Sequence, residues 1–254
     1  MKKILLSLIC GAVAMGAAAQ IKVHESAGLE TTHLWRGLEV SKGLTFNNDF
    51  SFSDKNDHFR LGFWGGMQVN GDYKEFDYYV QYKNGGFSAS LWDIYNFSDG
   101  IYDNSDAYKI FNYNCHTTGH FLDLTVAYNF GEKCPLNLSW STVIAGRDRG
   151  IDKDGKEVQR YSNFVQASYK VYEDEHFVVT PSVGAEFAFK NTLNADGEEK
   201  GTFYGEKAGV NDVRLNVTYK LKIGKHEMPV TATGMWNPEA NKGYFGVSVN
   251  LFSL

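Results

Sequence analysis

The sequence predicts an all-β fold, a transmembrane antiparallel up-and-down β-barrel of about 12 strands. Apolar and polar side chains alternate with a period of two along most of the chain, as they do in strands with two different faces. The alternating segments have roughly nine to eleven residues, the length that a tilted strand needs to cross a bilayer. Short and long connections also alternate between them, which predicts a barrel rather than a soluble sandwich.

The N-terminal segment predicts export. Two lysines follow Met1, an almost unbroken apolar run covers Ile4–Ala14, and small residues occupy Ala17–Ala19. This pattern is typical of a signal peptide, and its apolar run is shorter than the roughly 20 residues of a spanning helix. We therefore expect a cleaved signal peptide over 1–19 and one barrel domain over 20–254.

The first half of the mature chain contains five predicted strands. The second is the clearest, because large apolar residues occupy one face and small or polar residues the other. Asp93 is an exception on an apolar face, and we expect either a bulge near Trp92 or a position above the hydrocarbon. The predicted strands are Ile21–Arg36, Leu44–Ser53, Phe59–Val69, Glu75–Lys83 and Phe87–Tyr95.

Seven further strands follow in the second half with the same alternation. The last one carries Phe245, Val247 and Val249 on one face and should close the barrel against the first strand. These seven predicted strands are Leu122–Phe130, Leu136–Ile144, Val165–Val171, Phe177–Phe187, Asp212–Leu221, Met228–Trp236 and Gly243–Leu254.

The connections are sorted by parity. Those after even-numbered strands are tight, and the first connection, Gly37–Gly43, is of moderate length. The longest connections follow the fifth, seventh and ninth strands, at 98–119, 146–160 and 190–209. Outer-membrane barrels have short periplasmic turns and long external loops, so both chain ends are expected in the periplasm.

The composition limits the classes of partner that this chain is expected to bind. Lys and Arg total 25 and Asp and Glu total 30, which argues against a nucleic-acid partner. The chain has 15 Tyr and 18 Phe, many at the ends of apolar faces, where interfacial aromatic girdles would place them. We expect a location in the cell outer membrane, with its lipids, its assembly machinery and small polar solutes as partners.

The N-terminal third resembles a known family. Five short motifs between Ser26 and Phe97 carry the resemblance to the TorF-type porins, which are outer-membrane proteins of Gram-negative bacteria. Trp35 stands where that family more often has Phe before Arg-Gly, and the residue that leads the motif is His33 or Leu34 rather than an aromatic. The resemblance implies a barrel that acts as a channel, but it does not identify the solute. The motifs are Ser26–Glu30, His33–Glu39, Phe63–Gly65, Phe76–Tyr79 and Gly86–Ser88.

Charged residues on the polar faces are the candidate pore lining, and Arg36 is the candidate at the pore mouth. In a pore these charges would set ion selectivity, but they could equally pair across strands and fill a small barrel. Arg36 could attract anionic solutes, or it could only extend its charge to water beside a turn glycine. The lining candidates are Arg60, Glu75, Asp77, Lys83, Asp123, Glu186, Asp212, Arg214 and Lys220.

Other chemistry receives little support. The seven histidines show no metal-ligand spacing, and Asp152–Glu157 lacks the spacing of a calcium loop. Cys115 falls in an outer loop and Cys134 in a periplasmic turn, so a bilayer of about 30 Å should prevent a disulfide between them. We expect no metal, no cofactor and no enzyme activity, although a hydrolase triad assembled in space is not excluded by sequence.

The predicted function is passive diffusion of small polar solutes through the barrel. The alternative is a non-conducting barrel whose long external loops bind a ligand or a partner.

Overall fold

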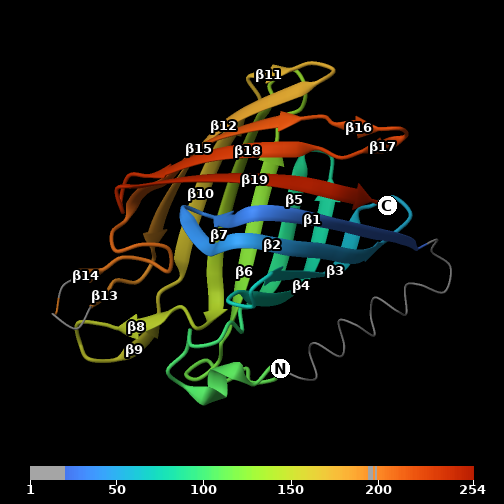
Figure 1. The fold of residues 1–254 in the computed structure, drawn as a ribbon. Helices are drawn as coiled ribbons and strands as arrows, with labels where there is room; N and C mark the ends of the chain where they lie inside the picture. The colour runs from blue at the N-terminus through green and yellow to red at the C-terminus, as the bar shows by residue number, and fades with distance from the viewer. Residues whose placement is uncertain (1–20, 194–196, 198) are drawn as a thin grey trace.

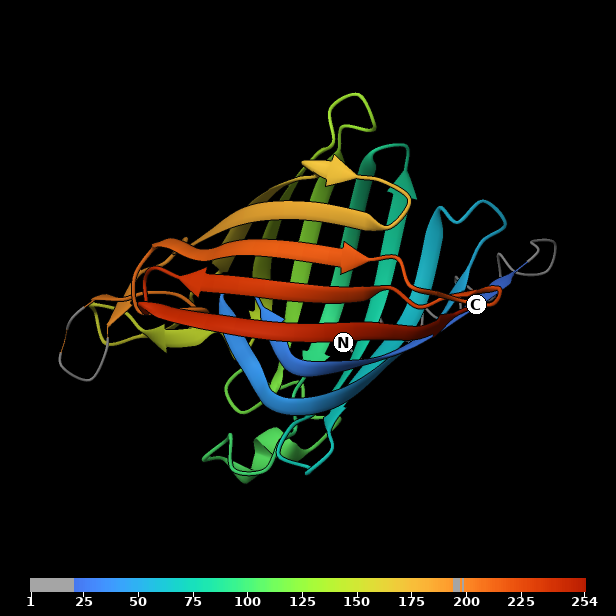
Figure 2. The ribbon, with the colours of Figure 1, turned by 45° about the horizontal axis from the view of Figure 1, so that its top comes forward.

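The computed structural model describes residues 21–193, 197 and 199–254 and shows a closed antiparallel β-barrel of 12 strands (Figures 1 and 2). The predicted signal peptide, 1–19, lies outside the described residues. Each barrel strand pairs with its neighbours along the chain, and the β10–β12 and β1–β19 pairings complete the ring. The barrel strands are β1 (Lys22–Trp35), β2 (Leu38–Ser53), β3 (Phe59–Gln68), β4 (Lys74–Asn84), β5 (Phe87–Tyr95), β6 (His120–Asn129), β7 (Leu136–Gly146), β10 (Ser162–Tyr169), β12 (Phe177–Ala188), β15 (Gly209–Tyr219), β18 (Val230–Asn237) and β19 (Lys242–Ser253).

The prediction that the last strand closes the barrel is confirmed. β19 pairs with β18 on one side and with β1 on the other, and Leu29 lies opposite Val249. No free sheet edge remains between the first and last strands, which protects the chain from edge-to-edge association.

The elements outside the barrel wall follow the predicted sorting of loops. At the end with the long loops, β8 (Arg149–Ile151), β9 (Glu157–Gln159), β13 (Thr192–Leu193) and β14 (Glu199–Lys200) form a small separate sheet, and η2 (Ser105–Tyr108) is a turn of 3-10 helix. At the opposite end, β11 (Tyr172–Glu173), β16 (Lys222–Ile223) and β17 (His226–Glu227) extend short turns. For brevity, we call the two ends external and periplasmic.

Helices contribute little to this fold. Within the described ranges, no helix has the length and apolar character needed to cross a membrane.

The two faces of the wall differ in polarity. Outward side chains such as Phe46 and Leu215 are exposed to 42% and 47%, whereas the inward Thr45, Ser51 and Asp212 are fully buried. The alternation read from the sequence is therefore the alternation of the wall, with apolar groups outside and polar groups inside. This arrangement is that of a barrel that crosses a bilayer.

The first hairpin is longer than predicted. The predicted connection Gly37–Gly43 was wrong, because β2 begins at Leu38 and its pairing with β1 reaches the Trp35–Leu38 pair. Arg36 (φ 46°) and Gly37 (φ 82°) alone make the turn. Two-residue hairpin turns favour such left-handed backbone at both positions, which costs glycine little.

Asp93 keeps its outward position. Strand pairing on both sides of β5 is regular around Trp92, so the predicted bulge is absent there. The nearest register shift is in the β6–β7 pair, between Leu122 and Asp123. Instead, Tyr113 and His120 bind the Asp93 carboxylate, and the side chain is buried.

The cysteine prediction is confirmed. Cys115 and Cys134 are both free and exposed. Cys115 lies in the external loop that precedes β6, and Cys134 lies in the periplasmic turn that follows it.

Candidate pore constriction

The tip of the β1–β2 hairpin is bound inside the barrel. The Gly37 backbone N–H donates to Asp212 Oδ2 on β15 at 3.0 Å, and Asn211 Nδ2 donates to the Arg36 carbonyl at 3.0 Å. On β18, Asn237 Nδ2 donates to the Gly37 carbonyl at 3.1 Å. Figure 2 shows the blue hairpin ending within the ring of strands. The tip therefore crosses part of the lumen instead of standing at its rim.

Arg36 spans the remaining distance to the opposite wall. Its two terminal nitrogens donate to the two carboxylate oxygens of Asp123 on β6, each at 2.7 Å, and one also donates to the Tyr204 hydroxyl at 2.6 Å. The guanidinium carbon lies 4.6 Å from the centre of the Trp35 ring. Two-pronged charged hydrogen bonds of this kind are short and directional, so they fix the position of the tip.

Apolar side chains surround this ion pair. Trp35, Leu38, Trp92 and Phe203 pack against a buried cluster formed by Ile94, Phe121, Val143, Phe164 and Tyr204. Six barrel strands and the loop between β12 and β15 contribute to this group. The lumen at this level is thus narrowed by aromatic rings as well as by the hairpin tip.

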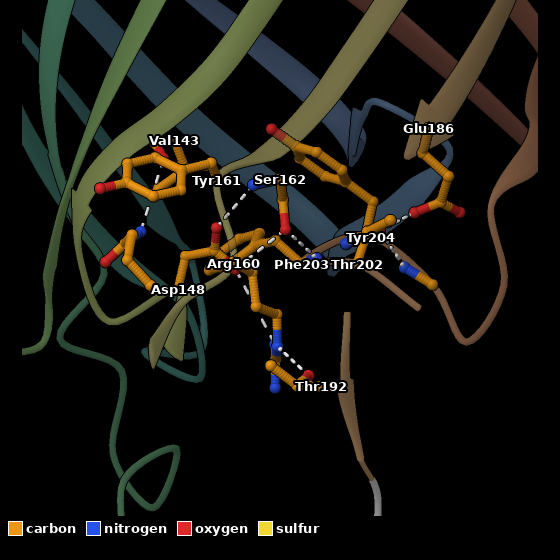
Figure 3. Close-up of polar contacts among 12 residues, drawn as sticks. Val143, Asp148, Arg160, Tyr161, Ser162, Glu186, Thr192, Thr202, Phe203 and Tyr204 are labelled. Carbon is orange, nitrogen blue, oxygen red and sulfur yellow. Dashed lines mark hydrogen bonds and ion pairs between the residues drawn. The ribbon is translucent and has the colours of Figure 1, made fainter. Parts of the chain in front are cut away.

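The β12–β15 loop is held in place by polar contacts at the barrel wall (Figure 3). The Thr202 hydroxyl donates to the carboxylate of Glu186 on β12, and the Phe203 N–H donates to Ser162 Oγ at 2.8 Å. Ser162 Oγ in turn donates to Asp148 at 2.9 Å. Burial raises the pKa of Asp148, and the bonds from Ser162 oppose that rise. These contacts present the loop's aromatic rings to the lumen.

The predicted lining residues fall into three groups. Asp123 and Asp212 are fully buried partners of the hairpin tip, and Arg214 binds Asp212 at 2.7 Å. Glu186 is buried beneath the β12–β15 loop.

Other predicted lining residues lie on inward faces away from the tip. Asp77 on β4 is buried and accepts a hydrogen bond from the Tyr95 N–H at 3.1 Å. Glu75 shares its face, and Arg60 is half-buried near the periplasmic end of β3.

The last two lysines lie at the periplasmic rim. Lys83 is exposed at the end of β4, and Lys220 follows the last residue of β15 and binds Glu173 at 2.7 Å. The structure thus places Arg36 in the lumen with Asp123, and it places Lys220 at the rim rather than along the lumen.

Sequence reasoning missed Trp35, Tyr204, Asn211 and Asn237 as parts of this site. Asn211 and Asn237 are buried amides at the external ends of their strands. A buried polar group must find a hydrogen-bond partner, but the sequence does not show that the partner is a hairpin backbone far away in the chain.

No metal site accompanies this arrangement in the part of the chain that the structure describes, since no group of three or more His, Cys, Asp or Glu side chains is placed to hold an ion.

Comparisons with known proteins give the fold a context. A scan against protein-family models finds no match, and a search of curated proteins finds none either. Among solved structures, the NanC porin aligns with 90% of this chain and 98% of its own, at 9% identity and a TM-score of 0.46. A mutant of the Rh. blastica porin covers 92% and 100% (10% identity, TM-score 0.36), and the anion-selective porin from Comamonas acidovorans covers 91% and 98% (10%, 0.32). At this level of likeness, no solute or mechanism is carried over from these porins to this chain.

Proposed function

We propose that this protein is a channel of the bacterial outer membrane, which passes small polar solutes by diffusion through a lumen narrowed at its external end. Outer-membrane lipids and the outer-membrane assembly machinery are its partners in this proposal. The resemblance of residues 26–97 to the TorF-type porins belongs to the same proposal, because the resemblance also implies a channel.

The proposal rests mainly on one observation: charged side chains are buried on the inward faces of the strands. Asp77, Asp123 and Asp212 are at most 4% exposed, and Arg36 and Arg214 lie beside two of them. Burying so many charges in a wall that is apolar outside is costly unless they serve a polar interior. The Arg36–Asp123 and Arg214–Asp212 pairs lie where the lumen is narrow. A polar solute that passes this level must therefore interact with their charged groups.

A second function is favoured by the aromatic cluster. Trp35, Phe121, Phe203 and Tyr204 pack around the Arg36–Asp123 pair and narrow the lumen there. A barrel closed at that level would not conduct, and its external loops would then act by binding a ligand or a partner.

Conductance in a planar bilayer tests the proposal directly. We expect the purified protein to give discrete current steps, and a salt gradient across the bilayer to give a reversal potential that reports the charge selectivity of the lumen. A protein that inserts and shows its folded electrophoretic mobility, yet gives no steps, would favour the non-conducting barrel.

A further inference from the structure

The external loop 96–119 lies against the outside of the barrel. Tyr95 belongs to the outward face of β5, and its hydroxyl donates to the Ala107 carbonyl of the loop at 3.2 Å. His120 belongs to the outward face of β6, and its Nε2 lies 2.9 Å from the Ile110 carbonyl oxygen. The loop therefore contacts the outward-facing side chains at the external ends of two strands.

Asp93 fastens the loop to this wall. Its carboxylate accepts one hydrogen bond from the Tyr113 hydroxyl at 2.6 Å and another from His120 Nδ1 at 2.8 Å. The His120 ring lies between Tyr95, which stacks on it at 4.1 Å between ring centres, and Tyr113, which is tilted against it at 4.6 Å. Asp93 and His120 are 8% and 1% exposed, so the loop shields both side chains from the medium outside the barrel.

The height of Asp93 in the wall explains why it needs this cover. On the same strand, Phe87 marks the periplasmic aromatic girdle with Tyr82 on β4, whose ring it contacts, and Tyr128, its pairing partner on β6. Strands rise about 3.3 Å per residue and tilt by about 40°, so Asp93 lies roughly 15 Å above Phe87 along the membrane normal. The apolar band of such barrels is about 25 Å tall. Asp93 therefore falls within the band, and so does the part of the loop that covers it.

The loop presents apolar side chains at this height. Ile110 is 42% exposed and Phe111 is 73% exposed, and they stand between the contact at His120 and the contact made by Tyr113. The neighbouring Asn112 turns into the loop instead, where its amide donates to Asp106 and Thr117. The exposed pair thus lies in the same segment of the loop that contacts His120 and Asp93.

We propose that loop 96–119 is a lipid-binding strap, in which Ile110 and Phe111 enter the acyl chains of the outer leaflet while the Tyr113–Asp93–His120 contacts hold the loop to the wall. The proposal rests on the membrane location given under the proposed function. Acyl chains are the partner that fits, because Ile110 and Phe111 are apolar and exposed in a loop that contacts the outward side chains of β5 and β6, and the neighbouring Lys109 is paired with Asp106.

Spin labels measure this directly. Cys115 and Cys134 are exposed and unpaired, so a variant with both replaced by serine provides a background for a single cysteine at Phe111. The labelled protein is reconstituted in vesicles of phosphatidylethanolamine and phosphatidylglycerol, and power saturation compares collisions with oxygen, which prefers lipid, and with a nickel chelate, which prefers water. Because Phe111 is mostly exposed, its replacement should leave the fold intact.

Two reference positions make the outcome decisive. A label at Leu215, which is 47% exposed on the outward face of β15, reports lipid, and a label at Ile151, 47% exposed on β8, reports water. We expect the oxygen-to-nickel ratio at Phe111 to match that at Leu215 and to exceed that at Ile151 several-fold. A ratio at Phe111 equal to that at Ile151, with Leu215 still in lipid, would overturn the strap alone. A water-like ratio at Leu215 would instead overturn the membrane location itself.

Discussion

The two ends of the barrel use charge in different ways. In the lumen near the external end, two ion pairs are buried: the side chains of Arg36 and Asp123 are 13% and 2% exposed, and those of Arg214 and Asp212 are 16% and 0%. At the periplasmic end, the pairs are open to water, as in the pair of Lys22 with Asp57. A buried pair is costly to form and more costly to break, whereas an exposed pair contributes little in either case.

In the proposed channel, this difference would separate a functional end from a structural one. The Arg36–Asp123 pair joins positions 87 residues apart and crosses the lumen, and Arg214 binds Asp212, which holds the Gly37 N–H of the same hairpin tip. We therefore expect these contacts to set the width of the lumen. The periplasmic pairs join neighbouring turns and strand ends, and they leave the lumen unchanged. Substitutions at the two ends should therefore differ both in stability and in conductance.

Asp123→Ala should have the largest effect. It leaves the Arg36 guanidinium beside Trp35 and Tyr204 without its carboxylate, and breaking a buried pair costs about 3–5 kcal/mol. We expect the midpoint of urea unfolding, monitored by tryptophan fluorescence, to fall. We also expect single-channel conductance to rise several-fold as the hairpin tip leaves the lumen.

The matched control is Lys22→Ala, which breaks the exposed pair with Asp57 at the other end. It should change neither quantity beyond experimental error. Equal losses of stability in the two variants would contradict the contrast between the ends, and unchanged conductance in Asp123→Ala would show that the hairpin tip does not limit flow.

Gly37→Ala should have a smaller effect, and Gly85→Ala isolates its cause. Both glycines are left-handed, with φ values of 82° and 56°, so both substitutions carry a strain of about 1 kcal/mol. A Cβ on Gly37 would lie 2.4 Å from the Asn211 carbonyl oxygen, whereas a Cβ on Gly85 meets no atom within 4 Å among the described residues.

The difference between these two variants measures how tightly the tip is held. We expect Gly37→Ala to lose about 1–3 kcal/mol more than Gly85→Ala in urea unfolding, since overpacking costs about that much, and only Gly37→Ala to raise the conductance. If the two alanine variants lose the same stability and conduct alike, the tip is free to move and its contacts with β15 do not constrain it.

Most of the barrel could be predicted from the sequence because its wall repeats one local rule. Alternation located every barrel strand, and it turned Asp123 and Asp212 inward as the structure has them. It failed where the local rule is broken: Gly43, at φ 139°, suggested a loop although it lies inside β2. The alternation assigns Lys220 to the inward face together with Asp212 and Arg214, but β15 ends one residue before it.

The constriction could not be predicted in the same way. Arg36 and Asp123 are 87 positions apart, and neither residue carries a local signal that they meet. The inward course of the hairpin follows from the two-residue turn and from three hydrogen bonds with β15 and β18, and all of these depend on the closed ring. The covered position of Asp93 likewise depends on a loop whose path the sequence does not show.

The smallest expected effect is at the periplasmic end, and it depends on pH. Bonds from Lys170 and Lys220 lower the pKa of Glu173 to about 2, from an ordinary value of about 4.3. A carboxyl group with a lowered folded-state pKa adds stability above its unfolded pKa, and this stability is lost as the pH falls toward the folded value. The wild type should therefore lose stability as the pH falls from about 4.5 to about 2. Glu173→Gln lacks this carboxyl group, so its stability should fall less over the same range.

Urea midpoints measured across this pH range test the prediction, with Glu175→Gln as the control, because the Glu175 side chain is 84% exposed two residues further along the same turn. We expect the wild type and Glu175→Gln to show the same slope and Glu173→Gln a shallower one, with conductance unchanged in all three. A change in conductance for Glu173→Gln would mean that the periplasmic pairs also reach the lumen. The division of the barrel into a functional and a structural end would then have to be abandoned.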